Sequence, residues 1–432
     1  MSYNNQIKIA ILTAGADAQG VSSRYLNEAR LLPDTVVKEV SMWNHKKEGK
    51  IEKLEALQKR EASLDDFIIN KEKNIKDSDV HFDYSQDYAR QHILFEAPQN
   101  ETDYESSMGR AVEGAKYIYV SPPSSHLRSV LHTLSKVVKE GQIVIIRSKG
   151  AEYKETNNSI LIYTPYQIAK EELAGKGTPK FIEGGLNFSS EIINNVFQYS
   201  MISTGTKKGD KDNFRQKLIN ETKNDLKARG YVIKDSRYLV TPQLSWIFKN
   251  IGAMAAGVTS GYNLKYDDPI NYDAESVRLN LVQSFMSNLV PIVYEMGGNT
   301  NAWNSIPVSV TDFLGTSLSE NSRNFRAGKL KSQGKSLEEI ADEIKMTIEG
   351  IHQLKQINKI VEKRPDLDPA GIIKSTYDIF YNEANIGEII NKISNLDQGN
   401  YRKGFWSLRT IQTKGPFQDL RGKSEPIRID LH

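Results

Sequence analysis

The 432-residue sequence contains no cysteine. Without thiols the chain can form no disulfide, no cysteine nucleophile and no thiolate metal site, and such a composition suits a reducing compartment. We therefore expect a cytoplasmic protein. The chain is longer than one hydrophobic core usually grows, so two domains are expected.

Long apolar runs and a large excess of one charge are also missing. No stretch approaches the roughly 20 apolar residues of a membrane helix, and the first residues lack the pattern of a secretory signal. Lys and Arg number 57 against 54 Asp and Glu, which gives a formal net charge of +3. We therefore expect no membrane span and no nucleic-acid partner, and an anionic ligand must be bound by a few local cations.

Histidine is scarce, with seven residues in the chain. His126 and His132 are six positions apart and would not share one face of a helix. Because neither thiolates nor a suitable histidine spacing are present, we expect no metal site.

The first half of the sequence alternates short apolar runs with helical patterns. An apolar run at 7–12, a turn rich in small residues, a helix at Val21–Leu32 and a strand at Val36–Trp43 are typical of the start of a Rossmann unit. Further elements are expected as strands at 116–120, 143–147, 181–185 and 200–204, helices at 125–139 and 212–229, and an extended segment at 231–240. The sequence thus predicts an α/β, Rossmann-type dinucleotide-binding domain over residues 1–234, with an inserted segment at about 46–105.

The second half is dominated by long helical patterns. They are clearest at Leu244–Gly261, Ala274–Met296 and Ser336–Lys363, and Ser336 with Glu339 forms a capping-box signature. We expect an all-helical C-terminal domain over residues 235–397. A tail over 398–432 mixes glycine, proline and charge.

The turn from Gly15 to Gly20 could bind a phosphate, because glycines before a helix let backbone N–H groups approach an anion. The spacing would suit a P-loop, but Val21 stands where that motif requires lysine. The dinucleotide fingerprint is imperfect as well, because Thr13 replaces its first glycine and Gly20 comes two residues late. A plain structural turn remains the alternative.

The residues after the second strand are basic rather than acidic. Asn44, His45 and Lys46 stand where NAD enzymes usually place a carboxylate for the ribose hydroxyls. A 2′-phosphate, and hence NADP, would be tolerated at least as well as NAD. A solvated run of charges is the alternative.

A series of short motifs follows in a fixed order along the chain. The motifs are Pro123-Ser124, Ser148-Lys149-Gly150, Gly185-Leu186-Asn187-Phe188-Ser189, Phe248-Lys249-Asn250, Gly297-Gly298-Asn299, Thr311-Asp312-Phe313, Ser322-Arg323-Asn324 and Ile348-Glu349-Gly350. In order, identity and spacing they resemble the NAD(P)-dependent glycerol-3-phosphate dehydrogenase family of bacteria, from about Lys8 to Glu388. The glycine-rich turn departs from the family pattern, since it lacks the first glycine and an aromatic residue.

The resemblance implies a role for each matching residue. Lys249 would exchange a proton with the substrate oxygen, Lys149 would lie between cofactor and substrate, and Asp312 would complete the catalytic group. The substrate would be bound by Lys149, Gly185, Asn187, Asn250, Thr316, Ser322, Arg323 and Asn324. The cofactor would be bound by Gly15, Ala16, Asp17, Gly20, His45, Pro123, Lys149, Ser189, Arg323, Ile348 and Glu349.

The implied reaction is reversible reduction of dihydroxyacetone phosphate to sn-glycerol 3-phosphate with NADH or NADPH. The chemistry is reasonable, because an ammonium can stabilise and protonate a developing alkoxide, and arginine binds phosphate through two donors at once. The resemblance also suggests a homodimer. Two alternatives stay open: a non-catalytic protein that binds a nucleotide or a partner, and a dehydrogenase for another anionic ketone. Considered alone, Lys249 could simply snorkel from an apolar helix and Asp312 could be an N-cap.

Overall fold

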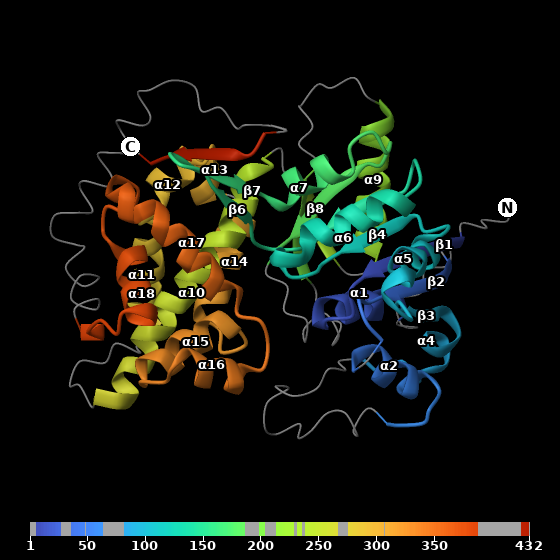
Figure 1. The fold of residues 1–432 in the computed structure, drawn as a ribbon, viewed down its shortest axis with the longest axis horizontal. Helices are drawn as coiled ribbons and strands as arrows, with labels where there is room; N and C mark the ends of the chain where they lie inside the picture. Colours follow the sequence, from blue (N-terminus) through green and yellow to red (C-terminus); the bar gives the residue numbers. More distant parts are fainter. Residues whose placement is uncertain are drawn as a thin grey trace. The chain divides into compact units, whose positions relative to one another are not determined.

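The computed structural model describes residues 6–26, 36–47, 49–63, 82–185, 198–203, 213–228, 231–235, 238–266, 275–305, 307–387 and 425–431. The chain divides into two compact units, coloured by sequence in Figure 1. Unit 1 comprises Met1–Ser148 and Pro165–Arg237, and unit 2 comprises Lys149–Thr164 and Tyr238–His432. We describe each unit by itself.

Unit 1 is built on an eight-stranded sheet with the strand order β10-β9-β8-β5-β4-β1-β2-β3. Six neighbouring strands, from β3 to β8 in this order, are parallel, and their succession is that of a Rossmann fold. Strand β9 runs antiparallel to β8, and β10 runs parallel to β9. The strands are β1 (Gln6–Leu12), β2 (Val36–Trp43), β3 (Ile93–Glu96), β4 (Tyr117–Val120), β5 (Ile143–Ile146), β8 (Lys180–Gly184), β9 (Gln198–Ser203) and β10 (Tyr231–Asp235). The predicted Rossmann-type fold is confirmed.

The central strands are apolar on both faces because helices cover the sheet. Every residue of β4 and of β5 is buried, as expected of parallel strands between two helical layers. Helices α5, α6 and α7 pack successively against one another (Figure 1). The helices of unit 1 are α1 (Ala16–Leu26), α2 (Lys50–Gln58), α4 (Asp87–His92), α5 (Tyr104–Val112), α6 (Ser124–Val137), α7 (Pro165–Glu172) and α9 (Asn213–Ala228), with a short 3₁₀ turn, η2 (Glu101–Asp103).

Two features of unit 1 differ from the sequence prediction. Helix α1 begins at Ala16 rather than Val21, so Gly20 lies in the helix and not in the turn before it. The inserted segment also contributes to the fold, since α2 buries Ile51, Leu54 and Leu57 and β3 extends the sheet beside β2. Residues 64–81 of this segment lie outside the described residues.

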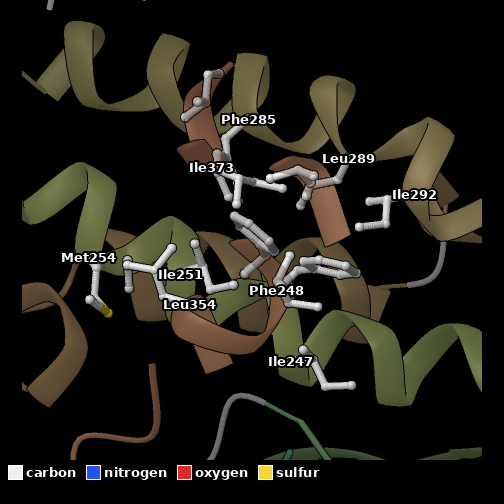
Figure 2. Close-up of a cluster of buried hydrophobic side chains, with 14 of the residues drawn as sticks. Ile247, Phe248, Ile251, Met254, Phe285, Leu289, Ile292, Leu354 and Ile373 are labelled. Atoms are coloured by element: carbon white, nitrogen blue, oxygen red, sulfur yellow. The ribbon is translucent and has the colours of Figure 1, made fainter. Parts of the chain in front are cut away.

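Unit 2 is mainly helical and is organised around the 27-residue helix α10 (Val240–Tyr266). Figure 2 shows Phe248 and Ile251 of α10 in one apolar cluster with Phe285, Leu289 and Ile373. The other helices are α11 (Glu275–Asn288), α12 (Val290–Glu295), α13 (Thr300–Ser305), α14 (Pro307–Leu318), α15 (Arg323–Ser332), α16 (Leu337–Ile344), α17 (Glu349–Lys363) and α18 (Ile372–Tyr381), with a 3₁₀ turn, η3 (Pro365–Leu367). No helix in the described part of the chain is both long and apolar enough to cross a membrane.

Helices α10 and α15 approach each other at glycines. A Cβ atom on Gly257 would overlap the Phe325 carbonyl oxygen, and one on Gly328 would overlap the Met254 carbonyl oxygen. The absence of side chains therefore lets the two backbones meet directly, which fixes the start of α15 close to the middle of α10.

Two helices predicted in unit 2 are each divided in the structure. The predicted helix 274–296 is divided at Leu289, and the predicted helix 336–363 is divided after Lys345, whose φ of 51° ends α16 in the left-handed region. The capping box of Ser336 and Glu339 is confirmed.

The unit is not all-helical, because a three-stranded sheet of β6 (Glu152–Glu155), β7 (Ser159–Tyr163) and β11 (Ile427–Asp430) belongs to it. Residues 149–164 thus group with unit 2 rather than with the first domain, and the predicted tail supplies β11.

Candidate active site

The centre of the site in unit 2 is an ion pair between Lys249 of α10 and Asp312 of α14. The Lys249 ammonium donates to Asp312 Oδ1 over 2.6 Å. Lys249 is 6% exposed and Asp312 1% exposed, so both charges are removed from bulk water. The two opposite charges compensate each other, because a single unpaired charge buried at this position would be strongly disfavoured.

Two further candidates surround this pair. The Lys149 ammonium lies 3.9 Å from Asp312 Oδ2, and the Thr316 hydroxyl donates to Asp312 Oδ1 over 3.4 Å. Asp312 and Thr316 share one face of α14 because they are four residues apart. Three residues from separate parts of the sequence, Lys149, Lys249 and Thr316, are thus gathered around one carboxylate.

The environment of Lys249 makes its ammonium easier to deprotonate. Burial and the positive charge of Lys149 lower the pKa of Lys249 to about 8, although Asp312 acts in the opposite direction. A lysine with a pKa close to neutrality can both donate and accept a proton under ordinary conditions. Its position and its pKa therefore suit general acid–base catalysis.

A chain of side-chain amides joins three helices beside this pair. The Asn324 amide donates to Asn250 Oδ1 over 2.9 Å, and the Asn250 amide donates to Gln353 Oε1 over 3.1 Å. The backbone N–H of Gly350 donates to Asn324 Oδ1 over 3.0 Å. Asn250 and Asn324, both expected to contact substrate, thus bind each other and connect α10, α15 and α17.

The motif that should hold the substrate phosphate begins α15. Ser322 is the N-cap of this helix, and its hydroxyl accepts from the Phe325 N–H over 3.3 Å. Arg323 Nη1 donates to the Thr347 carbonyl oxygen over 3.0 Å. Arg323 therefore lies beside the segment that carries Ile348 and Glu349, two residues expected to bind the cofactor.

Unit 1 brings other candidates to one edge of its sheet. Gly15 follows β1, Pro123 follows β4 and His45 follows β2, and the carboxyl ends of these parallel strands meet at the same edge. In open α/β sheets this edge binds the ligand, at the point where the strand order reverses. Ala16 and Asp17 form the first turn of α1 at this place.

The backbone beside Gly15 is open toward the described residues. Among these, a Cβ atom on Gly15 would meet within 4 Å the Thr13 hydroxyl alone, at 3.7 Å. Thr13, at the position of the family's first glycine, has a φ of 152°, which side-chain-bearing residues rarely adopt. The backbone thus keeps a glycine-like conformation although the residue has changed.

Positive groups gather around His45. Burial lowers the pKa of His45, and the nearby charges of Lys46, His126 and Lys50 lower it further. His126 belongs to the first turn of α6, far from His45 in sequence. The structure therefore adds His126 and Lys50 to the basic cluster expected from the sequence.

Some candidate residues belong neither to the set around Asp312 in unit 2 nor to the set at the sheet edge of unit 1. Gly185 is buried directly after β8, Gly20 is buried within α1, and Asn187 and Ser189 lie outside the described residues. Sequence reasoning missed Gln353 and Arg147. A glutamine on the apolar stripe of α17 and an arginine at the end of an apolar strand were the available signals.

Comparisons with known proteins match both halves of the chain to one family. A family model described as the N-terminus of NAD-dependent glycerol-3-phosphate dehydrogenase matches residues 8–209, and the model of its C-terminus matches residues 239–391. The chain belongs to this family. The non-catalytic alternative is not favoured, and the chain is an NAD(P)-dependent oxidoreductase acting on a CH–OH group.

Individual relatives are distant but cover most of the chain. Glycerol-3-phosphate dehydrogenase [NAD(P)+] from Fusobacterium nucleatum is 24% identical over 68% of this chain and 79% of its own length. The enzyme of the same name from Clostridium tetani is 26% identical over 62% and 68%, respectively. The solved glycerol-3-phosphate dehydrogenase of Coxiella burnetii shares the fold, with a TM-score of 0.62 and 15% identity over 91% of this chain and 99% of that one.

Proposed function

We propose that the chain catalyses the reversible reduction of dihydroxyacetone phosphate to sn-glycerol 3-phosphate, with Lys249 as the group that exchanges a proton with the substrate oxygen. The observation that carries this proposal is the buried Lys249–Asp312 pair with Lys149 at its side. It combines three charged residues of the family motifs in one place, and a purely structural lysine would not need the second cation.

The reaction adds a hydride to the carbonyl carbon and builds negative charge on the carbonyl oxygen. NADH or NADPH supplies the hydride when bound. The Lys249 ammonium stabilises the developing alkoxide and transfers its proton to it, and in the reverse direction the neutral amine removes the hydroxyl proton. Lys149 favours the neutral amine, while Asp312 and Thr316 hold the ammonium in position.

Arg323 is proposed to bind the substrate phosphate. Its guanidinium has five donors in a planar fork, and its Nη1 is steadied by the Thr347 carbonyl. It also begins α15, where the positive end of the helix dipole adds to the attraction for an anion. Ser322 contributes by capping this helix rather than by free rotation toward a ligand.

The cofactor is proposed to bind at the carboxyl edge of the sheet in unit 1. The open space beside Gly15 and the N-terminus of α1 fit a pyrophosphate. The basic cluster of His45, Lys46, Lys50 and His126 fits the ribose end and supports NADP as well as NAD. The fit is qualified by one carboxylate, Asp17, in the first turn of α1.

NADH and NADPH oxidation measured across a panel of phosphorylated, carboxylated and neutral ketones tests the proposal. Turnover should be greatest with dihydroxyacetone phosphate, and Lys249→Ala should lower kcat by a factor on the order of 10² to 10⁴ while cofactor affinity changes little. Lys363→Met, which alters an exposed lysine at the end of α17, is the matched control and should leave kcat unchanged. Folded protein that oxidises neither cofactor with any ketone would refute the assignment.

We also propose that the chain acts in the cytoplasm as a homodimer. The lack of cysteine suits a reducing compartment, and dimers are suggested by the family resemblance. Cell fractionation and light scattering on the purified protein test these two statements separately.

A further inference from the structure

Unit 1 contains a buried charge network that the proposed reaction does not use. It consists of Arg147, which directly follows β5, Glu183 of the neighbouring strand β8, and Asp17 in the first turn of α1. The side chain of Arg147 is 3% exposed and that of Glu183 is fully buried. These three side chains, two carboxylates and one guanidinium, carry a summed formal charge of −1, at the edge of the sheet where a dinucleotide is expected.

The two carboxylates bind different sides of the guanidinium. Nε and Nη2 of Arg147 donate to the two carboxylate oxygens of Asp17, each over 2.9 Å, while Nη1 donates to Glu183 Oε1. Two parallel bonds from Nε and Nη2 are also the way in which arginine binds two oxygens of a phosphate. Asp17 thus occupies the phosphate-binding side of Arg147, and Glu183 anchors the opposite side.

The position of Asp17 makes this arrangement relevant to the cofactor. Asp17 is the second residue of α1 and lies two positions after Gly15. The dipole and the unsatisfied N–H groups at such a helix start stabilise any anion, including the carboxylate of a first-turn aspartate. A pyrophosphate at this turn would therefore meet a site that already holds a negative charge.

We propose that Arg147 is a phosphate-recognition residue of the cofactor site and that Asp17 is its resident competitor. In the protein without nucleotide the Asp17 carboxylate satisfies the guanidinium. When the dinucleotide binds, its pyrophosphate takes over Nε and Nη2, and the Asp17 side chain, already 35% exposed, turns to solvent. Glu183 keeps Arg147 in place throughout, because it is buried and bound to the other side of the guanidinium.

This inference rests on the use of NAD or NADP by the chain. It adds that Asp17 and Arg147 together set the affinity for the cofactor's phosphates. The competition lowers the affinity for every ligand that carries a phosphate at this turn, and it leaves the affinity for the nucleoside part unchanged. Removing the charge of Asp17 should therefore tighten phosphate binding selectively. A purely structural ion pair would not produce this selectivity.

The first experiment titrates wild-type protein and Asp17→Asn with NADH, ADP and adenosine, using the nicotinamide fluorescence directly or by competition. We expect Asp17→Asn to lower the Kd for NADH and for ADP by about three- to tenfold, the range for loss of a partly exposed charged contact, and to leave adenosine binding unchanged. Asp87→Asn, which alters an exposed ion-paired aspartate of α4, is the matched control and should change none of the three. Unchanged or weakened ADP binding by Asp17→Asn would overturn the proposal, as would an equal effect on adenosine.

The second experiment removes the guanidinium. Arg147→Gln alone would leave the Glu183 carboxylate buried without the guanidinium and could unfold the protein. The double variant Arg147→Gln/Glu183→Gln is therefore used as well. Thermal unfolding shows whether each variant is folded. In the folded double variant, ADP binding should weaken by more than about tenfold. Adding Asp17→Asn to it should then give a smaller gain than in the wild-type background, because only the repulsion at the helix start is left to remove. If Asp17→Asn tightens ADP binding just as much without Arg147, the two residues do not compete and the proposal fails.

These outcomes also separate the inference from the cofactor assignment. Wild-type protein that binds neither NADH nor NADPH would contradict both. Normal binding of NADH with no selective effect of Asp17→Asn would contradict the competition alone.

Discussion

The pH dependence of turnover should follow the charge of Lys249, whose pKa is lowered to about 8. Reduction of the ketone needs the ammonium, so the single-turnover rate should fall about tenfold per pH unit above pH 8. Oxidation of the alcohol needs the neutral amine, so its rate should rise toward pH 8 and then level off. Single-turnover rates are the appropriate measurement because they separate the chemical step from product release.

Two substitutions should move the midpoint of the pH–rate profile, which reports the pKa of Lys249, in opposite directions. Asp312→Asn removes the negative charge 2.6 Å from the Lys249 ammonium, so the pKa of Lys249 should fall further. An opposite charge at such a distance typically shifts a pKa by about 1 to 3 units. Lys149→Met removes a neighbouring positive charge, so the midpoint should rise, and by less, because Lys149 is 23% exposed and partly screened.

The position of the midpoint is the decisive quantity, because both variants should also lose rate. Lys363→Met again serves as the control and should leave the midpoint unchanged. The reasoning is refuted if Asp312→Asn and Lys149→Met shift the midpoint in the same direction or leave it in place. In that case another group limits the rate, and Lys249 is a structural partner of Asp312.

Three further expectations concern the substrate, the cofactor and the helix contact. Arg323→Ala should reduce kcat/KM for dihydroxyacetone phosphate by a factor that corresponds to a free energy on the order of 2 to 4 kcal/mol. It should change kcat/KM for phosphate-free dihydroxyacetone little, and an equal loss on both substrates would exclude phosphate binding by Arg323. The ratio of kcat/KM for NADH to that for NADPH should stay below about 100, which corresponds to roughly 2.7 kcal/mol, and His45→Glu should raise it. Gly328→Ala should lower the free energy of unfolding by about 1 to 3 kcal/mol, measured by denaturant titration, because its Cβ would overlap the Met254 carbonyl of α10, whereas Lys331→Ala on α15 should change it little.

The apolar runs of the sequence predicted the central strands of unit 1. The strand predicted at Val36–Trp43 has the same bounds in the structure, and β5 ends one residue before its predicted end. The edge strand β3 was not predicted, because its apolar run is only three residues long and only Ile93 of its four residues is buried. The late start predicted for α1 had a different cause, since glycine at position 20 suggested a turn although it is packed inside the helix.

The second unit shows where local patterns are insufficient. Strand β11 pairs with β7, which lies more than two hundred residues earlier in the chain, and only tertiary packing brings the two together. The division at Leu289 comes two residues before Pro291, which has no N–H group to continue the helical hydrogen bonds, so this boundary had a sequence signal. The left-handed conformation of Lys345, which ends α16, is not encoded by an apolar periodicity. The motif order led us to expect Lys249, Asp312 and Lys149 in one catalytic group, and their side chains lie together in the structure. It could not reveal which side chains bind one another.

The amide network explains why a motif residue can matter without touching a ligand. Lys249 and Asn250 are adjacent on α10, so their side chains point about 100° apart around the helix axis. The bonds from Asn250 to Gln353 and Asn324 fix the rotation of α10, because turning the helix would leave buried amides unsatisfied at about 1 to 3 kcal/mol each. With Asn250 held against α15 and α17, Lys249 is directed toward Asp312 on α14. We infer that the asparagines orient Lys249 through the helix that carries it. This role, like direct binding of a substrate, would require asparagine at both positions.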